Sequence, residues 1–379
     1  MVAGEASGDR LGADLIKGLR RQIKKIEFQG VAGPEMKAHG IDSLFEMSEI
    51  SVMGLTEILP KYIGLKRRLS QTVNAVLKFK PEILITIDSP DFCLRIAKAV
   101  RAADPTIRTV HYVAPTVWAW RPKRAKKMAK FIDHVLALFP FEPSYMEAEG
   151  MACDFVGHPV ADMPEVVPKQ VAEFQESIGL DPNRPTVVVL PGSRRSEIQR
   201  LLPIFCDTLS HPDFANVQLI IPTLPHLAAL VRDYIQFLPQ DYLVVTGDGL
   251  SANDAAEQRF LAFSASTAAL AASGTVSLEL AAAGTPMVIA YDMGFLSRVI
   301  IGGMLRVDTV TLVNLISDTR DIPEFIGNHC RADLITSALL KLLADPHSQD
   351  RTMRKTMELL GRGNIGLADC AAKAVLARL

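Results

Sequence analysis

The sequence predicts an α/β protein built from doubly wound parallel sheets, and three observations support this fold class. Short apolar runs rich in Val, Ile and Leu alternate with longer helix-like stretches along the chain, which is typical of parallel strands joined by crossover helices. The runs are apolar at successive positions rather than at every second one, as expected for a sheet covered on both faces. The 379 residues, 49% of them hydrophobic, are enough for two or three domains that each bury a core.

Seven apolar runs are predicted to be strands. They are residues 83–87, 109–113, 134–139, 187–190, 218–221, 242–245 and 286–291. The charge-free stretch 261–278 is long enough to span a membrane. Its Ser and Thr hydroxyls and Gly274 favour a buried strand, a turn and the start of a helix instead.

The alternating pattern lapses between residues 157 and 185, where prolines interrupt any regular element. We interpret this stretch as the hinge region between two α/β domains, residues 1–165 and 166–350. Residues 350–379 contain no proline and carry apolar residues at near-helical spacing. This pattern predicts a terminal helix in a third segment, residues 351–379.

The composition excludes several classes of protein. The chain carries 41 Lys and Arg against 42 Asp and Glu, a net charge of -1, so no overall field attracts nucleic acid and we expect no nucleic-acid partner. The five cysteines form no C-x-x-C pair, which favours a reducing compartment. Together with the lack of a signal-peptide pattern, this usage predicts a cytoplasmic protein. No P-loop, zincin, nucleophile-elbow or EF-hand motif is present and the eight histidines are scattered, so we expect no metal site and no cofactor.

Two glycine-containing loops are candidates for ligand binding. Glycines recur at every fourth residue from Gly4 to Gly12, where a first strand should pass into a helix; they either admit a ligand to backbone N–H groups or form a plain tight turn. In residues 190–197, a buried strand runs into Pro-Gly and a helix opening with arginines. That arrangement favours an anionic group, most naturally a diphosphate. The alternative is a capped helix with solvated arginines.

A similar strand, turn and helix arrangement occupies residues 272–279. Ser273 is a candidate N-cap of the helix. Glu279 lies in the first turns of an otherwise apolar helix, where its carboxylate needs donors such as ribose hydroxyls or, without a ligand, a backbone group or an arginine.

Two acidic residues directly follow the strand at residues 83–87. Asp88 is the better candidate for a general base, because a carboxylate at the carboxyl end of a parallel strand stands where open α/β sheets place their sites. The alternative is that Asp88 or Asp91 caps the next helix, and we expect this role for Asp91.

Two surface features point to anionic partners. Both tryptophans lie in the segment at residues 111–121, in a loop that follows a strand, which indicates a pocket or interface. A basic run follows at residues 121–130 and is either a solvated face or a site for an anionic substrate or membrane. Residues 55–69 form a broad apolar helical arc flanked by basic residues. Such an arc packs on a core or lies on an anionic bilayer. The candidate membrane residues are Ile58, Leu59, Tyr62, Ile63, Leu65, Lys66, Arg67 and Arg68.

Nine segments taken in order carry a family resemblance: residues 2–9, 30–34, 52–54, 87–92, 111–113, 117–121, 155–158, 190–194 and 272–275. Together they resemble the lipid-A-disaccharide synthase family of glycosyltransferases. The resemblance implies a B-type glycosyltransferase fold, with two Rossmann-like domains facing a cleft, the acceptor on the N-terminal domain, the UDP-sugar on the C-terminal one and a terminal helix crossing back. It implies UDP-2,3-diacylglucosamine and 2,3-diacylglucosamine 1-phosphate as substrates, at the inner face of the inner membrane of Gram-negative bacteria.

The resemblance also implies roles for individual residues. Asp88 would deprotonate the acceptor 6-hydroxyl and Arg194 would stabilise the departing diphosphate in an inverting, metal-independent reaction. The predicted nucleotide-sugar residues are Gly192, Ser193, Arg194, Ser273, Gly274, Thr275, Glu279 and Asn314. The predicted acceptor residues are Gly4, Glu5, Ser7, Gly8, Asp9, Trp118, Trp120 and Arg121.

Three questions stay open at the level of sequence. A UDP-sugar epimerase, a peptidoglycan-precursor glycosyltransferase or an idle nucleotide-sugar-binding protein at the membrane would share the nucleotide features. The oligomeric state is undetermined, with a homodimer as one option. Only Met1, Val2 and Ala3 precede Gly4, whereas the family normally has several apolar residues there; we therefore expect a start further upstream, or a stunted first strand that leaves a central sheet position poorly filled.

Overall fold

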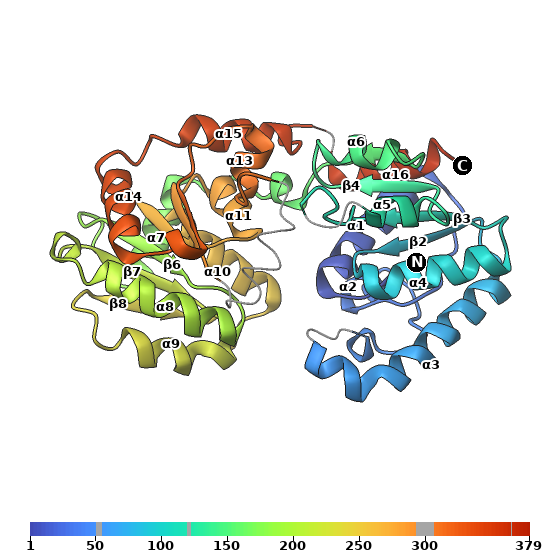
Figure 1. Cartoon of the computed structure of the whole chain (residues 1–379), viewed down its shortest axis with the longest axis horizontal. Helices are drawn as coiled ribbons and strands as arrows, with labels where there is room; N and C mark the ends of the chain where they lie inside the picture. Colours follow the sequence, from blue (N-terminus) through green and yellow to red (C-terminus); the bar gives the residue numbers. More distant parts are fainter. Residues whose placement is uncertain (51–54, 120–122, 293–306, 365) are drawn as a thin grey trace. The chain divides into compact units, whose positions relative to one another are not determined.

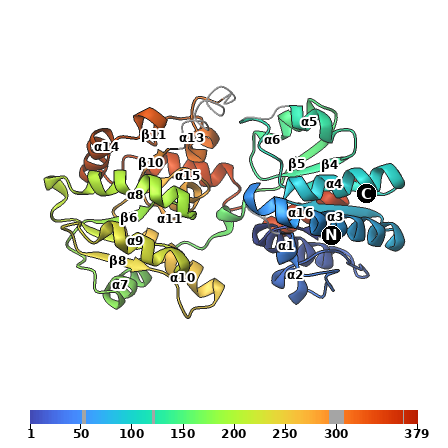
Figure 2. The same cartoon turned by 60° about the horizontal axis from the view of Figure 1, so that its bottom comes forward.

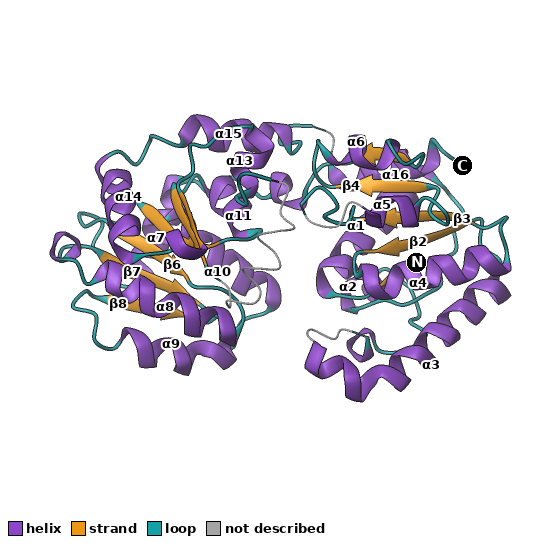
Figure 3. Ribbon diagram, in the orientation of Figure 1, coloured by secondary structure: helices purple, strands orange, loops and turns teal. Residues whose placement is uncertain are grey.

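The structure is a computed structural model that describes residues 1–50, 55–119, 123–292, 307–364 and 366–379, with side chains of the third helix described from residue 63 onward. The chain divides into two compact units (Figure 1). Unit 1 comprises Met1–Asp162 and Leu360–Leu379, and unit 2 comprises Met163–Leu359. Helices cover strands in both units (Figure 3).

Unit 1 is built on a parallel sheet. Its described strands form five-stranded order β1-β2-β3-β4-β5: Val2–Ala3, Ile83–Ile87, Arg108–Tyr112, His134–Ala137 and Ala152–Phe155. The α-helices of this unit are α1 (Ala6–Gln22), α2 (Pro34–Ala38), α3 (Leu55–Phe79), α4 (Pro90–Ala103), α5 (Lys123–Met128), α6 (Glu142–Glu147) and α16 (Leu367–Leu376). Short 3-10 helices span Met47–Glu49 and Pro159–Asp162.

Both faces of the unit 1 sheet are buried. Side chains alternate along β2, so that Ile85 packs with α1 and α16 while Leu84 packs with α3, α4 and α5 on the opposite face. Helices α1 and α16, far apart in sequence, lie side by side (Figure 2). Their approach depends on Gly18, because a Cβ there would come within 2.1 Å of the Ala368 carbonyl oxygen. Arg378 holds the chain terminus against β5 through two hydrogen bonds to Asp154, at 2.7 and 2.9 Å.

Unit 2 has a second parallel sheet. Its described strands form six-stranded order β11-β10-β9-β6-β7-β8: Glu324–Ile326, Met287–Tyr291, Ala268–Ala272, Thr186–Leu190, Gln218–Pro222 and Tyr242–Val245. The described α-helices are α7 (Pro168–Ser177), α8 (Arg195–Leu209), α9 (Ala228–Ile235), α10 (Ala252–Ser264), α11 (Val276–Ala283), α13 (Leu312–Ser317), α14 (Ala332–Ala344) and α15 (Asp350–Leu359). The 3-10 helices span Pro212–Phe214, Pro225–Leu227 and Gly327–His329.

The unit 2 sheet is also covered on both faces. Leu219 and Ile221 of β7 pack with α8, α9 and α14, whereas the intervening Ile220 packs with α7 and α10. The prediction of doubly wound parallel sheets is therefore confirmed. All seven predicted strands are present, and the stretch 261–278 contains β9 and the start of α11 as expected. No described helix is long and apolar enough to cross a membrane.

Two predictions about chain organisation differ from the structure. The proline-containing stretch 157–185 is not wholly irregular, because Pro168 stands in the first turn of α7, where proline is compatible with a helix. The predicted single terminal helix is two helices: α15 belongs to unit 2 and α16 to unit 1. The chain between them passes through Gly361 and Gly363, whose φ angles of 106° and 84° are incompatible with a continuous helix.

The first strand is short, as the sequence suggests. Val2 and Ala3 pair with Thr86 and Ile87 at the carboxyl end of β2. On its other edge Val2 forms a parallel bridge with Val31, and the Ala3 N–H donates to the Val31 carbonyl at 3.0 Å. The prediction that this strand has a central place in the sheet therefore agrees with the structure, because β1 has a neighbour on each side.

Candidate functional site

A pocket of about 580 Å³ lies in unit 2 at the carboxyl ends of β6, β7, β8 and β9. Gly192, Ser193 and Arg194 line it from the loop after β6. Ser273, Gly274 and Thr275 line it from the loop after β9, and Glu279 adds a carboxylate from α11. The structure thus brings together seven of the eight residues predicted to bind the nucleotide sugar, at the sheet edge where open α/β folds place their ligands.

The N-terminus of α11 offers free donors to this pocket. Gly274 has a φ of 158°, and the helix begins after Thr275 without a side-chain cap. The prediction that Ser273 caps the helix is wrong, because the chain turns into the helix two residues later. Within the described residues, the N–H groups of Gly274 and Thr275 donate to no protein acceptor. They are available for an anion, which the helix dipole also favours.

The loop after β6 is arranged differently from the sequence prediction. The N–H groups of Ser193 and Arg194 both donate to Oε2 of Glu197, at 3.0 and 3.2 Å. A guanidinium nitrogen of Arg194 lies 3.2 Å from the other carboxylate oxygen. The backbone donors expected to hold a diphosphate are therefore occupied by a carboxylate of the same chain. The Arg194 side chain is 65% exposed and retains further donors.

Glu279 pairs with an arginine in this structure. Its Oε2 accepts a hydrogen bond from Arg259 of α10 at 2.6 Å. This is one of the two partners that the sequence left open for a ligand-free state. Two further side chains on the pocket wall, Thr223 and Gln258, each have a buried oxygen without a partner among the described residues. Sequence reasoning missed both, because neither lies in a glycine-rich motif.

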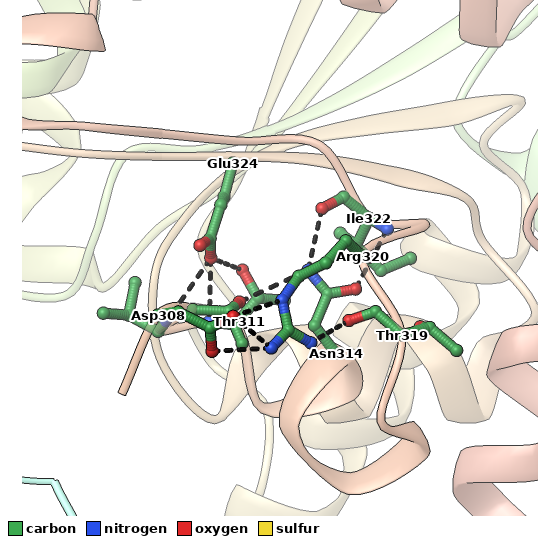
Figure 4. Close-up of polar contacts among 9 residues, drawn as sticks. Asp308, Thr311, Asn314, Thr319, Arg320, Ile322 and Glu324 are labelled. Atoms are coloured by element: carbon green, nitrogen blue, oxygen red, sulfur yellow. Dashed lines mark hydrogen bonds and ion pairs between the residues drawn. The ribbon is translucent and has the colours of Figure 1, made fainter. Parts of the chain in front are cut away.

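Asn314 is the predicted nucleotide residue that the structure places elsewhere. Its side-chain amide is 1% exposed, donates to the Ile322 carbonyl at 2.9 Å and accepts from the Ile322 N–H at 3.0 Å (Figure 4). Glu324 closes the same turn by accepting from the Thr311 N–H and hydroxyl at 3.0 and 2.7 Å. Asn314 does not line the pocket. The prediction of a nucleotide contact is not supported, because both ends of the amide hold the backbone.

Asp88 stands at the carboxyl end of β2 in unit 1 and is half-buried. Its carboxylate accepts from the Ser7 hydroxyl at 2.8 Å and from the Ser89 N–H at 2.9 Å. Both Asp88 and Ser89 adopt left-handed backbone, with φ of 53° and 44°, and Val113 at the end of β3 has a φ of 80°. Such strained residues concentrate at functional sites, which supports a role for this sheet edge.

Asp91 has a different position from its predicted one. It lies within the first turn of α4, whose N-cap is Ser89, and pairs with Arg124 at 3.1 Å. It therefore does not cap the helix.

The glycines of the first loop serve mainly to bring α1 close to β2. A Cβ at Gly4 would come within 2.5 Å of the Ser89 side chain, and one at Gly8 within 3.1 Å of the Ile87 carbonyl oxygen. Glu5 is held nearby by the Ser89 hydroxyl at 3.2 Å. Close packing therefore accounts for these two glycines without a ligand. Glu5 and Ser7 lie beside Ser89 and Asp88.

Asp9, predicted to contact the acceptor, is a structural residue. Its carboxylate is 1% exposed and accepts backbone N–H groups of Gly33, Glu35 and Met36 at 2.8, 2.8 and 3.1 Å. These are donors at the N-terminus of α2, which has no cap of its own side chains. Because the carboxylate is enclosed and satisfied, the prediction of acceptor contact is wrong for this residue.

Trp118 is enclosed by aromatic side chains. It meets Phe141 edge to face at 5.1 Å between ring centroids, and its indole N–H donates to Glu142 at 3.3 Å. Glu142 also accepts the N–H groups of Leu138 and Phe139. Burial raises the pKa of Glu142 to about 7. The prediction that Trp118 contacts the acceptor is not supported by this buried position, and Trp120 and Arg121 lie outside the described residues.

The predicted membrane helix is only partly exposed. Ile63 is 83% exposed and Lys66 and Arg67 are exposed, while the side chains of Ile58, Leu59 and Tyr62 lie outside the described set. Leu65 packs against the unit 1 core. Arg68 is held by Glu49, at 2.7 and 2.6 Å from one nitrogen, and lies over the Phe45 ring. Leu65 and Arg68 therefore face the protein, contrary to the prediction.

Unit 1 contains a second pocket. A pocket of about 370 Å³ lies at the amino end of the unit 1 sheet, between Met1, Phe28, Phe79 and Ile83. It is remote from the strand ends that carry Asp88 and Ser89. In the described ranges, no group of three His, Cys, Asp or Glu side chains is placed to hold a metal ion.

Comparisons with known proteins agree on the family. The family model described as lipid-A-disaccharide synthetase matches residues 1–377. A lipid-A-disaccharide synthase of Ruegeria pomeroyi is 52% identical over 381 residues, covering 100% of this chain and 94% of the relative. One of Rhodospirillum centenum is 42% identical over 382 residues, covering 99% of this chain and 93% of the relative.

Solved structures agree on the fold. The UDP-GlcNAc 2-epimerase of Neisseria meningitidis, bound to UDP-GlcNAc, has a TM-score of 0.64 at 12% identity and covers 99% of this chain and 97% of its own. MurG of Acinetobacter baumannii has a TM-score of 0.54 at 13% identity, with 94% of each chain covered. These neighbours establish two Rossmann-like units of the B-type glycosyltransferase architecture. The match over nearly the whole sequence goes further than the fold, and it shows that this chain belongs to the lipid-A-disaccharide synthase family of glycosyltransferases.

Proposed function

We propose that the protein transfers 2,3-diacylglucosamine from its UDP donor to the 6-hydroxyl of 2,3-diacylglucosamine 1-phosphate, forming the β(1→6) lipid A disaccharide 1-phosphate and UDP. The observation that carries this proposal is the unit 2 pocket, where free N–H groups of α11, the Arg194 guanidinium and the Glu279 carboxylate converge. That set matches the charges and hydroxyls of a nucleoside diphosphate sugar.

The nucleotide is held by complementary groups within unit 2. The diphosphate lies at the N-terminus of α11, where the N–H groups of Gly274 and Thr275 and the helix dipole favour negative charge. Arg194 faces the same pocket and supplies bidentate donors. Glu279 exchanges its hydrogen bond from Arg259 for those of the ribose hydroxyls.

The reaction is a single in-line displacement. An α-linked donor gives a β-linked product only by inversion, which requires one attack through an oxocarbenium-like transition state. Asp88 takes the proton from the acceptor hydroxyl as that oxygen attacks the anomeric carbon of the donor. The bond from that carbon to the diphosphate breaks, and Arg194 and α11 stabilise the charge on the leaving UDP.

Arg194 and the N–H groups of Gly274 and Thr275 stabilise the negative charge of the diphosphate, so the reaction needs no divalent cation. We therefore expect full activity in the presence of EDTA, measured as UDP release with both diacylated substrates. A loss of activity that Mg²⁺ restores would contradict the metal-independent mechanism. UDP release with either substrate alone would instead contradict transfer between the two.

The central experiment separates binding from chemistry in two variants. Asp88→Asn is expected to lower turnover by roughly 10²- to 10⁴-fold with near-normal UDP affinity, because a general base acts only on the chemical step. Arg194→Ala is expected to lower both turnover and UDP affinity. Asp91→Asn is the matched control, because this exposed aspartate pairs with Arg124 near the same sheet edge. Near-normal turnover of Asp88→Asn would refute the assigned base.

The protein acts at the cytoplasmic face of the inner membrane, where its lipid substrates are. Exposed Ile63 and the cationic Lys66 and Arg67 on α3 support contact with an anionic bilayer. Of the predicted acceptor residues, Glu5 and Ser7 contact the acceptor. Their hydrogen bonds with Ser89 and Asp88 support this role, because these hold them beside the proposed base.

A further inference from the structure

Glu197 lies in the first turn of α8, and its carboxylate points back over the loop that precedes the helix. Oε2 accepts the N–H groups of Ser193 and Arg194 at 3.0 and 3.2 Å. Oε1 lies 3.2 Å from Nη1 of Arg194. The carboxylate therefore contacts both the backbone and the side chain of the arginine that is proposed to stabilise the leaving group.

The loop is shaped to accept this carboxylate. Gly192 has a φ of 113°, a conformation that side chains other than glycine rarely adopt. A Cβ at Gly192 would come within 2.5 Å of Oε2 of Glu197. Because Gly192 has no side chain, the Glu197 carboxylate can occupy the space beside it. The Glu197 side chain is only 16% exposed, which places its carboxylate under the loop, whereas the Arg194 side chain is 65% exposed.

Among the described residues, Glu197 forms its ion pair with Arg194. Arg200, one turn further along α8, pairs instead with Asp292 at 3.8 Å. A guanidinium has five N–H donors, so a single contact to Glu197 fixes its direction and leaves others for a ligand. Glu197 lines the pocket together with Arg194.

We propose that Glu197 is a positioning residue that sets the direction of the Arg194 guanidinium toward the leaving diphosphate. This inference rests on the proposed function, in which Arg194 meets that diphosphate. It also assigns the diphosphate's backbone donors to α11, because Glu197 occupies those of the loop after β6. Glu197 itself makes no contact with the substrate.

A purely structural role is the alternative, because a glutamate three residues after the N-cap is a common helix-capping arrangement. The chain contains a matched example in α7, where the Gln170 side chain accepts the Val167 N–H at 3.1 Å. Gln170 does not line the pocket. Gln170→Ala therefore removes the same kind of cap from another helix of unit 2 and controls for loss of helix stability.

The test is a double-mutant cycle between Glu197 and Arg194, with kcat, KM, UDP affinity by calorimetry and thermal unfolding measured for each variant. Glu197→Ala is expected to lower kcat by about 10- to 100-fold, because a misdirected catalytic group costs on this order. Glu197→Gln retains an acceptor for the loop and is expected to recover most of that loss. In the Arg194→Ala background, Glu197→Ala is expected to have no further effect on kcat.

Each remaining outcome overturns a specific part of the proposal. If the losses of Glu197→Ala and Arg194→Ala multiply, or if Glu197→Ala resembles Gln170→Ala and changes only the unfolding temperature, Glu197 does not act through Arg194. Tighter UDP binding by Glu197→Ala would mean that the carboxylate competes with the nucleotide instead of positioning the arginine. Normal turnover of Arg194→Ala would overturn the proposed function itself, whatever Glu197 does.

Discussion

The Ser7 hydroxyl in the first turn of α1 donates a hydrogen bond of 2.8 Å to Oδ2 of Asp88 at the end of β2. The other carboxylate oxygen accepts the Ser89 N–H. Asp88 is thereby fixed on both sides by neighbours that belong to different elements. Gly8 makes this possible, because it lets α1 approach the Ile87 carbonyl closely enough for Ser7 to reach the carboxylate.

Replacing Ser7 tests whether this hydrogen bond orients the proposed base. Ser7→Ala is expected to lower kcat roughly three- to tenfold, since a single hydrogen bond contributes about 1 kcal/mol. Ser7→Thr keeps the hydroxyl and is expected to be less impaired. Ser337→Ala, at an exposed helical serine that donates to the Asp333 carbonyl, is the control in unit 2. Equal kcat for Ser7→Ala and the wild type would show that the contact is dispensable.

Substitutions of Glu279 and of Asn314 are expected to affect different properties, UDP binding for Glu279 and stability for Asn314. Glu279→Gln is expected to weaken UDP binding by about 10- to 100-fold, because hydrogen bonds to a charged group contribute about 1.5–3 kcal/mol. Asn314→Ala leaves the Ile322 backbone groups unpaired and is expected to lower the unfolding temperature by several degrees without changing the UDP dissociation constant. Calorimetry and thermal unfolding of both variants check this division. Weaker UDP binding by folded Asn314→Ala would restore the role that the sequence suggested for it.

Glu142 makes the stability of unit 1 depend on pH. Burial raises its pKa from 4.5 to about 7, so the folded protein holds this proton more tightly than the unfolded chain does. Protonated Glu142 makes its full contribution to the free energy of unfolding below about pH 4.5. As the pH rises through about 7, the free energy of unfolding falls by up to roughly 3 kcal/mol. Glu142→Gln removes this dependence. The stability difference between wild type and variant is therefore expected to change between pH 5 and 7 and to level off above pH 8.

Urea unfolding followed by tryptophan fluorescence measures this effect, because both tryptophans belong to the sequence of unit 1. His111 and His158 act in the opposite sense, since burial lowers the pKa of each to about 4. Their contribution to the free energy of unfolding rises with pH between about 4 and 6.5. It is the same in the wild type and in Glu142→Gln. Parallel stability curves for the wild type and Glu142→Gln would contradict the raised pKa.

The exposed Ile63 of α3 is expected to contribute to membrane binding. Ile63→Glu is expected to reduce co-sedimentation with phosphatidylglycerol-containing vesicles more than tenfold, because burial of an isoleucine side chain contributes about 1.5–3 kcal/mol. Phe237→Glu provides a matched control, since Phe237 is 84% exposed and belongs to unit 2. Equal losses for the two variants would indicate non-specific adsorption, and no loss for either would exclude α3 as the contact.

Most of the fold and part of the site follow from patterns that are local in the sequence. Apolar runs identified the central strands because a strand buried on both faces has few polar positions. The loops after β6 and β9 were found because glycine marks close approach of a backbone to a neighbour or a ligand. Thr223 and Gln258 were missed because a single polar residue without a motif does not reveal which wall it lines.

The sequence by itself determined the doubly wound architecture, the family and the position of Asp88 at a strand end. Only the tertiary structure decided which polar side chains remain available for a ligand. In the sequence, several polar groups look equally available to bind a ligand: those of Asp9, Asn314 and Trp118 and the backbone N–H groups of Ser193 and Arg194. In the structure, each of them forms a hydrogen bond with a partner from another turn, loop or element. The physical reason is that a buried polar group must find a hydrogen-bond partner, and that partner is chosen by the packing of the folded chain.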